Sequence, residues 1–109
     1  MRITKQEVKT NYSIEFTVED FKKVIEYGLY ETYMSDELKE YLEKNDISKD
    51  SLVDENVQCL FKRWNFNCEL LRLVASYFGF DGVDHFGSYN QNKKVRTLTV
   101  YNYGDYINK

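Results

Sequence analysis

The feature that most constrains this fold is a pair of helical patterns that almost touch in the sequence. Apolar residues recur at helical spacing in two stretches, which are typical of helices that bury one face. Only the three residues "NFN" lie between the stretches, and Gly79 follows the second as a stop signal. The sequence therefore predicts two short helices joined by a tight turn. Their stripes are Val53, Val57, Leu60, Phe61 and Trp64, then Leu70, Leu73, Val74, Tyr77 and Phe78.

A strand and two further helices are predicted before this pair. Residues 7–16 alternate between apolar and polar side chains, as a half-buried strand does. The expected N-caps of the four helices are Thr17, Ser35, Ser51 and Asn67, and acidic residues follow each of them. Asn45 is expected to end the second helix in a left-handed conformation.

A β-hairpin is predicted after the last helix. Two β-forming runs, at about 84–89 and 95–103, flank the polar tip "NQNKK". Either face of the second run can be the buried one, because both carry apolar side chains. One face holds Val95, Thr97, Thr99, Tyr101 and Tyr103, and the other holds Arg96, Leu98, Val100 and Asn102.

The 109 residues thus predict a single α+β domain. An N-terminal arm and strand occupy residues 1–16, about four helices occupy 17–79, and a hairpin occupies 83–103. From residue 51 to 103 the order of elements resembles that of winged helix-turn-helix domains. The two helical stripes, the "NFN" turn and the hairpin "HFGSYNQNKKVRTLTVYNY" carry this resemblance.

The resemblance implies binding to double-stranded DNA, with the second helix of the pair in the major groove and the hairpin as the wing. The helix positions off its apolar stripe are Glu69, Arg72, Ala75 and Ser76, which make a poor reading surface because direct readout favours Arg, Asn and Gln. The wing is better equipped for DNA. The candidate DNA-binding residues are therefore Lys93, Lys94, Arg96, Asn90, Gln91, Asn92 and Tyr89 in the wing, with Arg72, Lys5 and Lys9 elsewhere.

Two other roles for the basic tip stay open at this point. Charge at a hairpin tip also deters pairing between strand edges, and the third role is contact with a partner protein. If the tip binds DNA, five or six cations on one chain give modest affinity, so we expect a homodimer that doubles the contacts. Small acidic, Tyr-rich winged domains resemble accessory proteins of plasmids and phages, such as relaxosome components and transcriptional regulators.

The charge distribution supports a second hypothesis. Residues 12–55 hold thirteen acidic and five basic residues, a local charge of −8 within a chain of net charge −3. This acidic, Tyr-rich helical region either is a solvated face or binds a partner protein. In the second case the protein is an anti-defence inhibitor of a phage or plasmid.

Other classes of function find little support in the sequence. His85 follows Asp84 on a predicted strand, where neighbouring side chains point to opposite faces, and no catalytic motif occurs. We expect no enzyme activity, no metal and no cofactor. Cys59 and Cys68 are expected to be small buried side chains in a reducing compartment. We read neither a transmembrane segment nor a signal peptide, and so expect a cytoplasmic protein.

Overall fold

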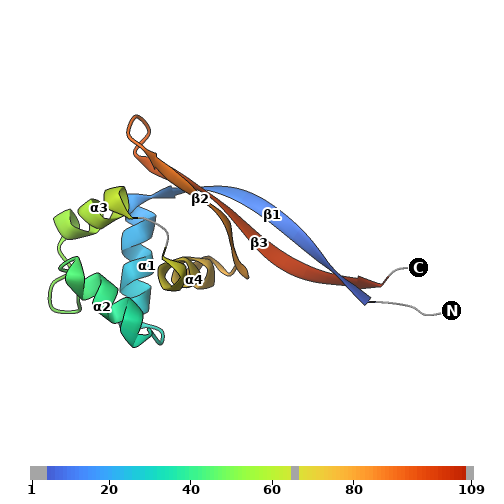
Figure 1. Cartoon of the computed structure of the whole chain (residues 1–109), viewed down its shortest axis with the longest axis horizontal. Helices are drawn as coiled ribbons and strands as arrows, with labels where there is room; N and C mark the ends of the chain where they lie inside the picture. Colours follow the sequence, from blue (N-terminus) through green and yellow to red (C-terminus); the bar gives the residue numbers. More distant parts are fainter. Residues whose placement is uncertain (1–4, 65–66, 108–109) are drawn as a thin grey trace.

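The computed structural model describes residues 5–64 and 67–107. It confirms an α+β chain with an N-terminal strand, helices and a C-terminal hairpin (Figure 1). The order along the chain is β1 (Lys5–Thr17), α1 (Val18–Tyr30), α2 (Asp36–Lys44), α3 (Asp54–Arg63), α4 (Cys68–Phe78), β2 (Gly82–Asn90) and β3 (Val95–Ile107).

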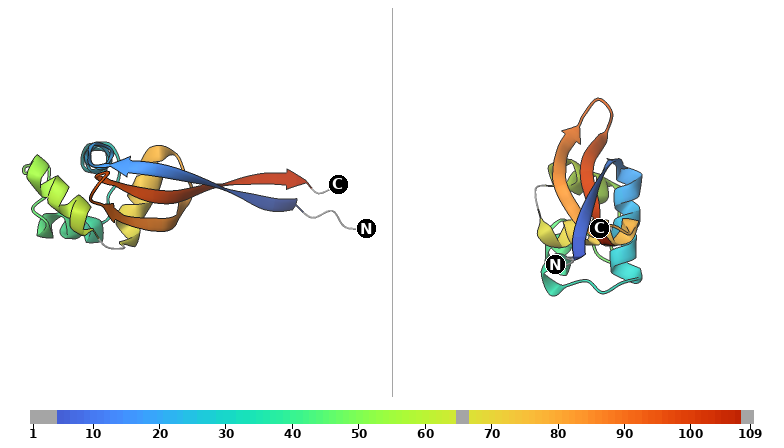
Figure 2. Two further views of the ribbon diagram at one scale, coloured as in Figure 1. Left: turned by 90° about the horizontal axis from the view of Figure 1, so that it is seen from above. Right: turned by 90° about the vertical axis from the view of Figure 1, so that its right-hand side faces the viewer.

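The strands form one antiparallel sheet in the order β1-β3-β2. β1 pairs with β3 over its whole length, from Lys5 opposite Ile107 to Thr17 opposite Val95. The pairing of β2 with β3 ends where Gly82 lies opposite Tyr101. Beyond that point β1 and β3 continue as a two-stranded ribbon that projects from the helical head and carries both chain ends (Figures 1 and 2). The molecule is elongated as a result, with extents of 60 × 33 × 18 Å.

The core lies between the helices and one face of the sheet. Leu98 and Val100 of β3 are fully buried, whereas Thr97 is exposed, so the face that also carries Arg96 is the one that packs on the helices. Phe16 of β1 supplies the centre of an aromatic cluster against this face. Its ring lies 5.8–6.5 Å from the rings of Phe21, Phe61, Trp64 and Phe78.

Most of the predicted helix ends are confirmed. Thr17 forms a full capping box with Asp20, and the side chains of Ser35 and Asn67 cap α2 and α4. Gly79 ends α4 with a φ of +80°, a conformation that only glycine adopts without strain. Local sequence chemistry therefore sets the bounds of three of these helices.

Two predicted helix signals are wrong. Ser51 does not cap α3, which begins at Asp54 after Val53; the backbone of Ser51 instead exchanges two hydrogen bonds with Ser48. The left-handed residue after α2 is Asp46, with a φ of +59°, rather than Asn45. Both differences arise in the connection 45–53, where the buried side chain of Ile47 anchors the backbone to the core.

The two cysteines are exposed, which corrects the expectation that they are buried. Cys59 points away from the face of α3 that buries Leu60, and Cys68 is the first residue of α4. Among the helices of the described residues, none is both long and apolar enough to cross a membrane.

Candidate nucleic-acid interface

The tip of the β2–β3 hairpin is a rigidly defined four-residue turn. The side-chain oxygen of Asn90 accepts hydrogen bonds from the backbone N–H groups of Asn92 and Lys93, both at 2.9 Å. Lys94 takes a φ of +60°, and its N–H donates to the Asn90 carbonyl at 2.7 Å. These hydrogen bonds hold the turn in one conformation, and the side chains of Lys93 and Lys94 are exposed to solvent.

Arg96 does not belong to this exposed tip, and its predicted place among the accessible cations is wrong. Its side chain is only 3% exposed because it lies on the core-facing side of β3. The guanidinium reaches the C-terminal end of α3, where the last carbonyls of a helix lack partners within the helix. It donates to the carbonyl oxygens of Phe61 at 2.9 Å, Lys62 at 3.2 Å and Trp64 at 2.9 Å.

A bulge in β2 supplies a fourth acceptor for Arg96. The register of β2 against β3 shifts between Phe86 and Tyr89, and the Gly87 carbonyl accepts from the guanidinium at 3.0 Å. A Cβ atom at Gly87 would lie 2.1 Å from the carbonyl oxygen of Thr97, so this close approach of the two strands requires glycine.

Three aromatic rings surround the same guanidinium. Its central carbon lies 4.8 Å from the ring centre of Phe86 and 5.7–5.8 Å from those of Phe61 and Trp64. Burial lowers the pKa of Arg96 from its ordinary value, and nearby tyrosines oppose this shift. Carbonyl dipoles and ring faces together stabilise a buried cation here. Arg96 therefore joins the hairpin to α3.

The cations of the last turn of α3 lie on the surface next to this contact, because both lie off the buried face of the helix. Lys62 and Arg63 are both exposed, and the contacts of Arg63 within the described residues are long ones, of 3.4 Å to Cys59 and Asn45. We call Lys62, Arg63, Lys93 and Lys94 the hairpin cation cluster.

Two hollows flank the hairpin beside this cluster, and Lys62 and Tyr89 line both of them. One, of about 380 Å³, also has Arg63 and Gln91 in its wall, and the other, of about 220 Å³, has Lys94. Among the described residues, no carboxylate lines either hollow.

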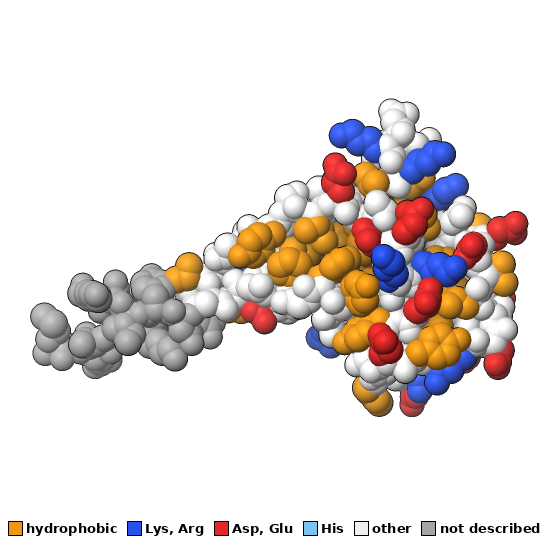
Figure 3. All heavy atoms as spheres, turned by 180° about the vertical axis from the view of Figure 1, so that it is seen from behind, with side chains coloured by type: hydrophobic (Ala, Val, Ile, Leu, Met, Phe, Trp, Pro, Cys, Tyr) orange, Lys and Arg blue, Asp and Glu red, His pale blue; other side chains and the backbone are white. Residues whose placement is uncertain are grey.

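Three further hollows in the described part of the chain provide a contrast. Each of them has at least one carboxylate in its lining: Glu43 and Asp50, Glu19 and Asp54, or Glu69. Figure 3 shows Lys and Arg side chains at the end of the hairpin, with acidic side chains spread over the head below. The two hollows beside the hairpin are thus lined by cations and, among the described residues, by no carboxylate.

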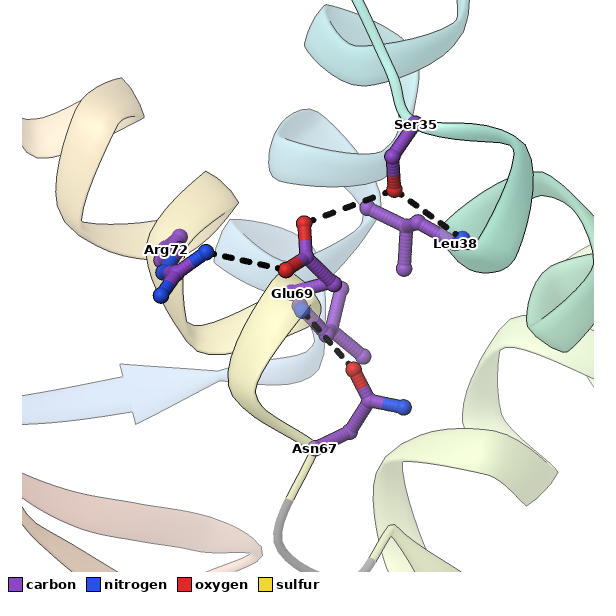
Figure 4. Close-up of polar contacts among 6 residues, drawn as sticks. Ser35, Leu38, Asn67, Glu69 and Arg72 are labelled. Atoms are coloured by element: carbon purple, nitrogen blue, oxygen red, sulfur yellow. Dashed lines mark hydrogen bonds and ion pairs between the residues drawn. The ribbon is translucent and has the colours of Figure 1, made fainter.

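Polar side chains of α4 make hydrogen bonds with each other and with other helices, and Figure 4 shows those of its first turns. Arg72 donates to one oxygen of Glu69 at 3.0 Å, and the other oxygen of Glu69 accepts from Ser35, the cap of α2, at 3.4 Å. Further along, Ala75 is buried and Ser76 shares a hydrogen bond of 3.1 Å with Tyr27 of α1. Glu69 and Ser76 are thereby joined to α2 and α1, whereas Arg72 pairs within α4 and its side chain is 77% exposed.

The predicted cations of the N-terminal arm are also separate from the hairpin tip. Lys9 forms an ion pair of 2.6 Å with Asp84 and lies 4.5 Å from the ring centre of Tyr101. This hydrogen bond to Asp84 is the main cause that raises the pKa of Lys9. Lys5 begins β1, and its side chain lies outside the described residues.

The structure therefore brings together only the wing part of the predicted set, without Arg96. Reasoning from the sequence missed Lys62 and Arg63 as site residues, since two cations in a last helical turn are accounted for by the helix dipole. The available signal was their position, because both lie off the apolar stripe of α3. No group of three or more metal-binding side chains gathers within residues 5–64 and 67–107.

Comparison with protein-family models, with curated proteins and with solved structures found no match to this chain.

Proposed function

We propose that this chain is a double-stranded DNA-binding protein of the winged helix-turn-helix type that contacts DNA through its hairpin. The observation that carries this proposal is the pair of acid-free hollows beside the hairpin, which share Lys62 and adjoin the exposed cations of the tip. A helix pair that precedes a hairpin, in a three-stranded sheet of order β1-β3-β2, is compatible with such a domain. By analogy with small winged proteins, its role is that of an accessory or regulatory protein of a mobile element.

The hydrogen bonds of α4 support the hairpin over the helix as the DNA-contacting element. Entry of α4 into a groove would bring Glu69 against phosphates or break its bonds to Arg72 and Ser35. Binding through the hairpin tip would neither bring a carboxylate of residues 90–94 against phosphates nor break these hydrogen bonds. A two-stranded ribbon fits the major groove, and Gln91 and Asn92 add side chains that can donate to and accept from base edges. The cluster cations contact phosphates, which set affinity and position.

A binding experiment on mixed-sequence duplex DNA tests this assignment. Lys93→Ala/Lys94→Ala removes the tip cations without touching the buried Arg96, and should weaken binding at least about tenfold. Lys39→Ala/Lys44→Ala removes two exposed cations from α2 and is the matched control. Equal affinities of the two variants would exclude the hairpin as the main contact.

A second candidate function, inhibition of a partner protein, rests on a different part of the surface. A hollow of about 490 Å³ lies between α1, α2 and the connection 45–51, with Leu29, Leu42 and Ile47 in its lining. Tyr33 is 85% exposed and lines this hollow, and its charged lining residues are Glu43, Asp50, Lys39 and Lys49. An apolar hollow with an aromatic edge suits an apolar side chain of a partner, and the charge of −8 over residues 12–55 favours a basic one.

This alternative predicts activity against a nuclease that holds DNA in a basic channel. The chain should inhibit DNA cleavage by a purified defence nuclease, and Glu37→Lys/Glu40→Lys should remove the inhibition. Glu55→Lys, an exposed charge reversal on α3, is the control. Inhibition that is unchanged in the double variant would rule out the acidic face.

A further inference from the structure

The two-stranded ribbon has an open edge and exposed apolar side chains. Within the described residues, β1 has β3 on one side and no strand on the other. Val8 is 40% exposed and Tyr12 is 46% exposed, although both lie on the face that buries Phe16 closer to the head. Figure 3 shows hydrophobic side chains continuing from the head along the ribbon.

A two-stranded ribbon of this kind has little stability of its own in water. Two strands without a third strand or a packed helix are marginally stable. Natural sheets also protect long edges with prolines, bulges, short strands or charged side chains, because open edges pair with other chains. The chain contains no proline, and the register of β1 with β3 is unbroken from Lys5 to Thr17. Among the described side chains of β1 the charged ones are Lys9, which is paired with Asp84, and Glu15.

We infer that a second copy of this chain covers the edge, with the two β1 strands paired antiparallel about a two-fold axis at Thr10. The axis lies normal to the sheet, so each side chain stays on its own face and residues of the same parity lie opposite each other. Val8 of each copy then lies opposite Tyr12 of the other, and the two sheets join into one of six strands.

The side-chain pattern of β1 selects this register over its neighbours. An axis at Lys9 would place two Lys9 side chains opposite each other, which is destabilising. An axis at Val8 would place the two Val8 side chains opposite each other and would leave Tyr12 without an apolar partner among the described residues. An axis at Tyr12 would put Val8 opposite the buried Phe16, next to the start of α1. Only the Thr10 axis pairs both exposed apolar positions with each other.

Tyr12 also connects this contact to the core of each copy. Its ring lies 5.5 Å from the ring of Phe80, which packs against the hydrophobic core. Burial of Tyr12 beneath Val8 of the second copy therefore extends the apolar face of the head without a break. Aromatic and β-branched residues opposite each other are favourable pairs across antiparallel strands.

Disulfide trapping tests the register directly. In a Cys59→Ser/Cys68→Ser background, which removes the exposed native thiols, Thr10→Cys should form a disulfide-linked dimer on mild oxidation. Opposed Cα atoms about 4.5–5.5 Å apart suit a disulfide. Val8→Cys alone should not link, because its two copies are about 13 Å apart along the strands. Linkage of Val8→Cys as fast as Thr10→Cys, or no linkage of Thr10→Cys, would overturn the register.

Sedimentation equilibrium tests the dimer without any introduced cysteine. The wild-type chain should be a dimer at tens of micromolar, and Val8→Lys should weaken association at least about tenfold. Tyr33→Lys changes a more exposed aromatic residue on the head and should leave the dimer intact. A wild-type monomer, or a Val8→Lys variant that associates as strongly as wild type, would contradict dimerisation through β1. Neither experiment contains DNA. A chain that does not dimerise through β1 would therefore leave the proposal of DNA binding by the hairpin untouched, and a failure to bind DNA would leave the proposed dimer untouched.

Discussion

The guanidinium of Arg96 donates a hydrogen bond of 2.9 Å to the carbonyl oxygen of Trp64, the residue that ends α3. This contact joins the hairpin strand β3 to the helix that carries Lys62 and Arg63. Arg96 therefore positions the hairpin cation cluster and does not belong to it.

Replacement of Arg96 should destabilise the fold, because it leaves up to four buried carbonyl groups without a donor. Arg96→Met should lower the free energy of unfolding by at least about 3 kcal/mol, since each unpaired buried group costs roughly 1–3 kcal/mol. Urea denaturation measures the change. Lys94→Met removes the same charge from an exposed position and should stay within about 0.5 kcal/mol of wild type. Similar urea midpoints for the two variants would show that Arg96 does not stabilise the fold.

A methyl group at the bulge should disturb the same network. Gly87→Ala should cost about 1–3 kcal/mol of stability, because its Cβ would collide with the Thr97 backbone. The same change at Gly104 places the Cβ 4.0 Å from the Val8 carbonyl oxygen, which is ordinary contact. Thermal denaturation should therefore separate the two alanine variants, with Gly104→Ala close to wild type. The reverse order would be incompatible with the observed bulge.

DNA binding should depend on the end of α3 and not on α4. Lys62→Ala should weaken binding to duplex DNA severalfold, because a phosphate contact is lost. Arg72→Ala should change the affinity less than about twofold, since Arg72 is bonded to Glu69 on another side of the head. Fluorescence anisotropy with the same labelled duplex measures the DNA affinity of both variants. A larger loss of DNA affinity with Arg72→Ala than with Lys62→Ala would indicate that α4 is the DNA-contacting element.

Stability should fall in alkaline solution in a way that depends on Tyr41. Burial is the main cause that raises the pKa of Tyr41 above its ordinary value near 10, against the pull of Arg63 and Arg96. The unfolded chain then loses this proton before the folded chain does, so the free energy of unfolding decreases as the pH rises above about 10. Tyr41→Phe should make this decrease shallower, as measured by urea denaturation between pH 9 and 11. If the free energy of unfolding of Tyr41→Phe falls with pH as steeply as that of wild type, the alkaline loss of stability comes from other groups.

Much of the fold could be predicted from the sequence because its signals are local. Alternation in residues 7–16, three of the helix caps and the stop at Gly79 depend only on neighbouring residues, and all are confirmed. The connection 45–53 could not be predicted in the same way. There the buried Ile47, rather than the capping preference of Ser51, determines where the backbone runs.

The candidate site was harder to predict because its central interaction joins distant parts of the chain. In the sequence, Arg96 is one of three cations at a hairpin, and nothing local distinguishes it from Lys93 and Lys94. Its burial follows from which face of β3 packs on the helices, and both faces carry apolar residues. The contact of Arg96 with α3 places the end of that helix beside the hairpin, so Lys62 and Arg63 adjoin the tip cations, and no local pattern contains this proximity.

The salt dependence of DNA binding is the most direct test of the hairpin cation cluster. Log affinity plotted against log salt should have a slope near −3.6 per bound chain for wild type if four cations of that chain each contact a phosphate, at about 0.9 per contact. Lys62→Ala/Arg63→Ala/Lys93→Ala/Lys94→Ala should reduce the slope to nearly zero. The control Lys23→Ala/Lys39→Ala/Lys44→Ala/Arg72→Ala, which removes four exposed cations elsewhere, should keep it. Equal slopes for the two fourfold variants would contradict DNA binding through the hairpin.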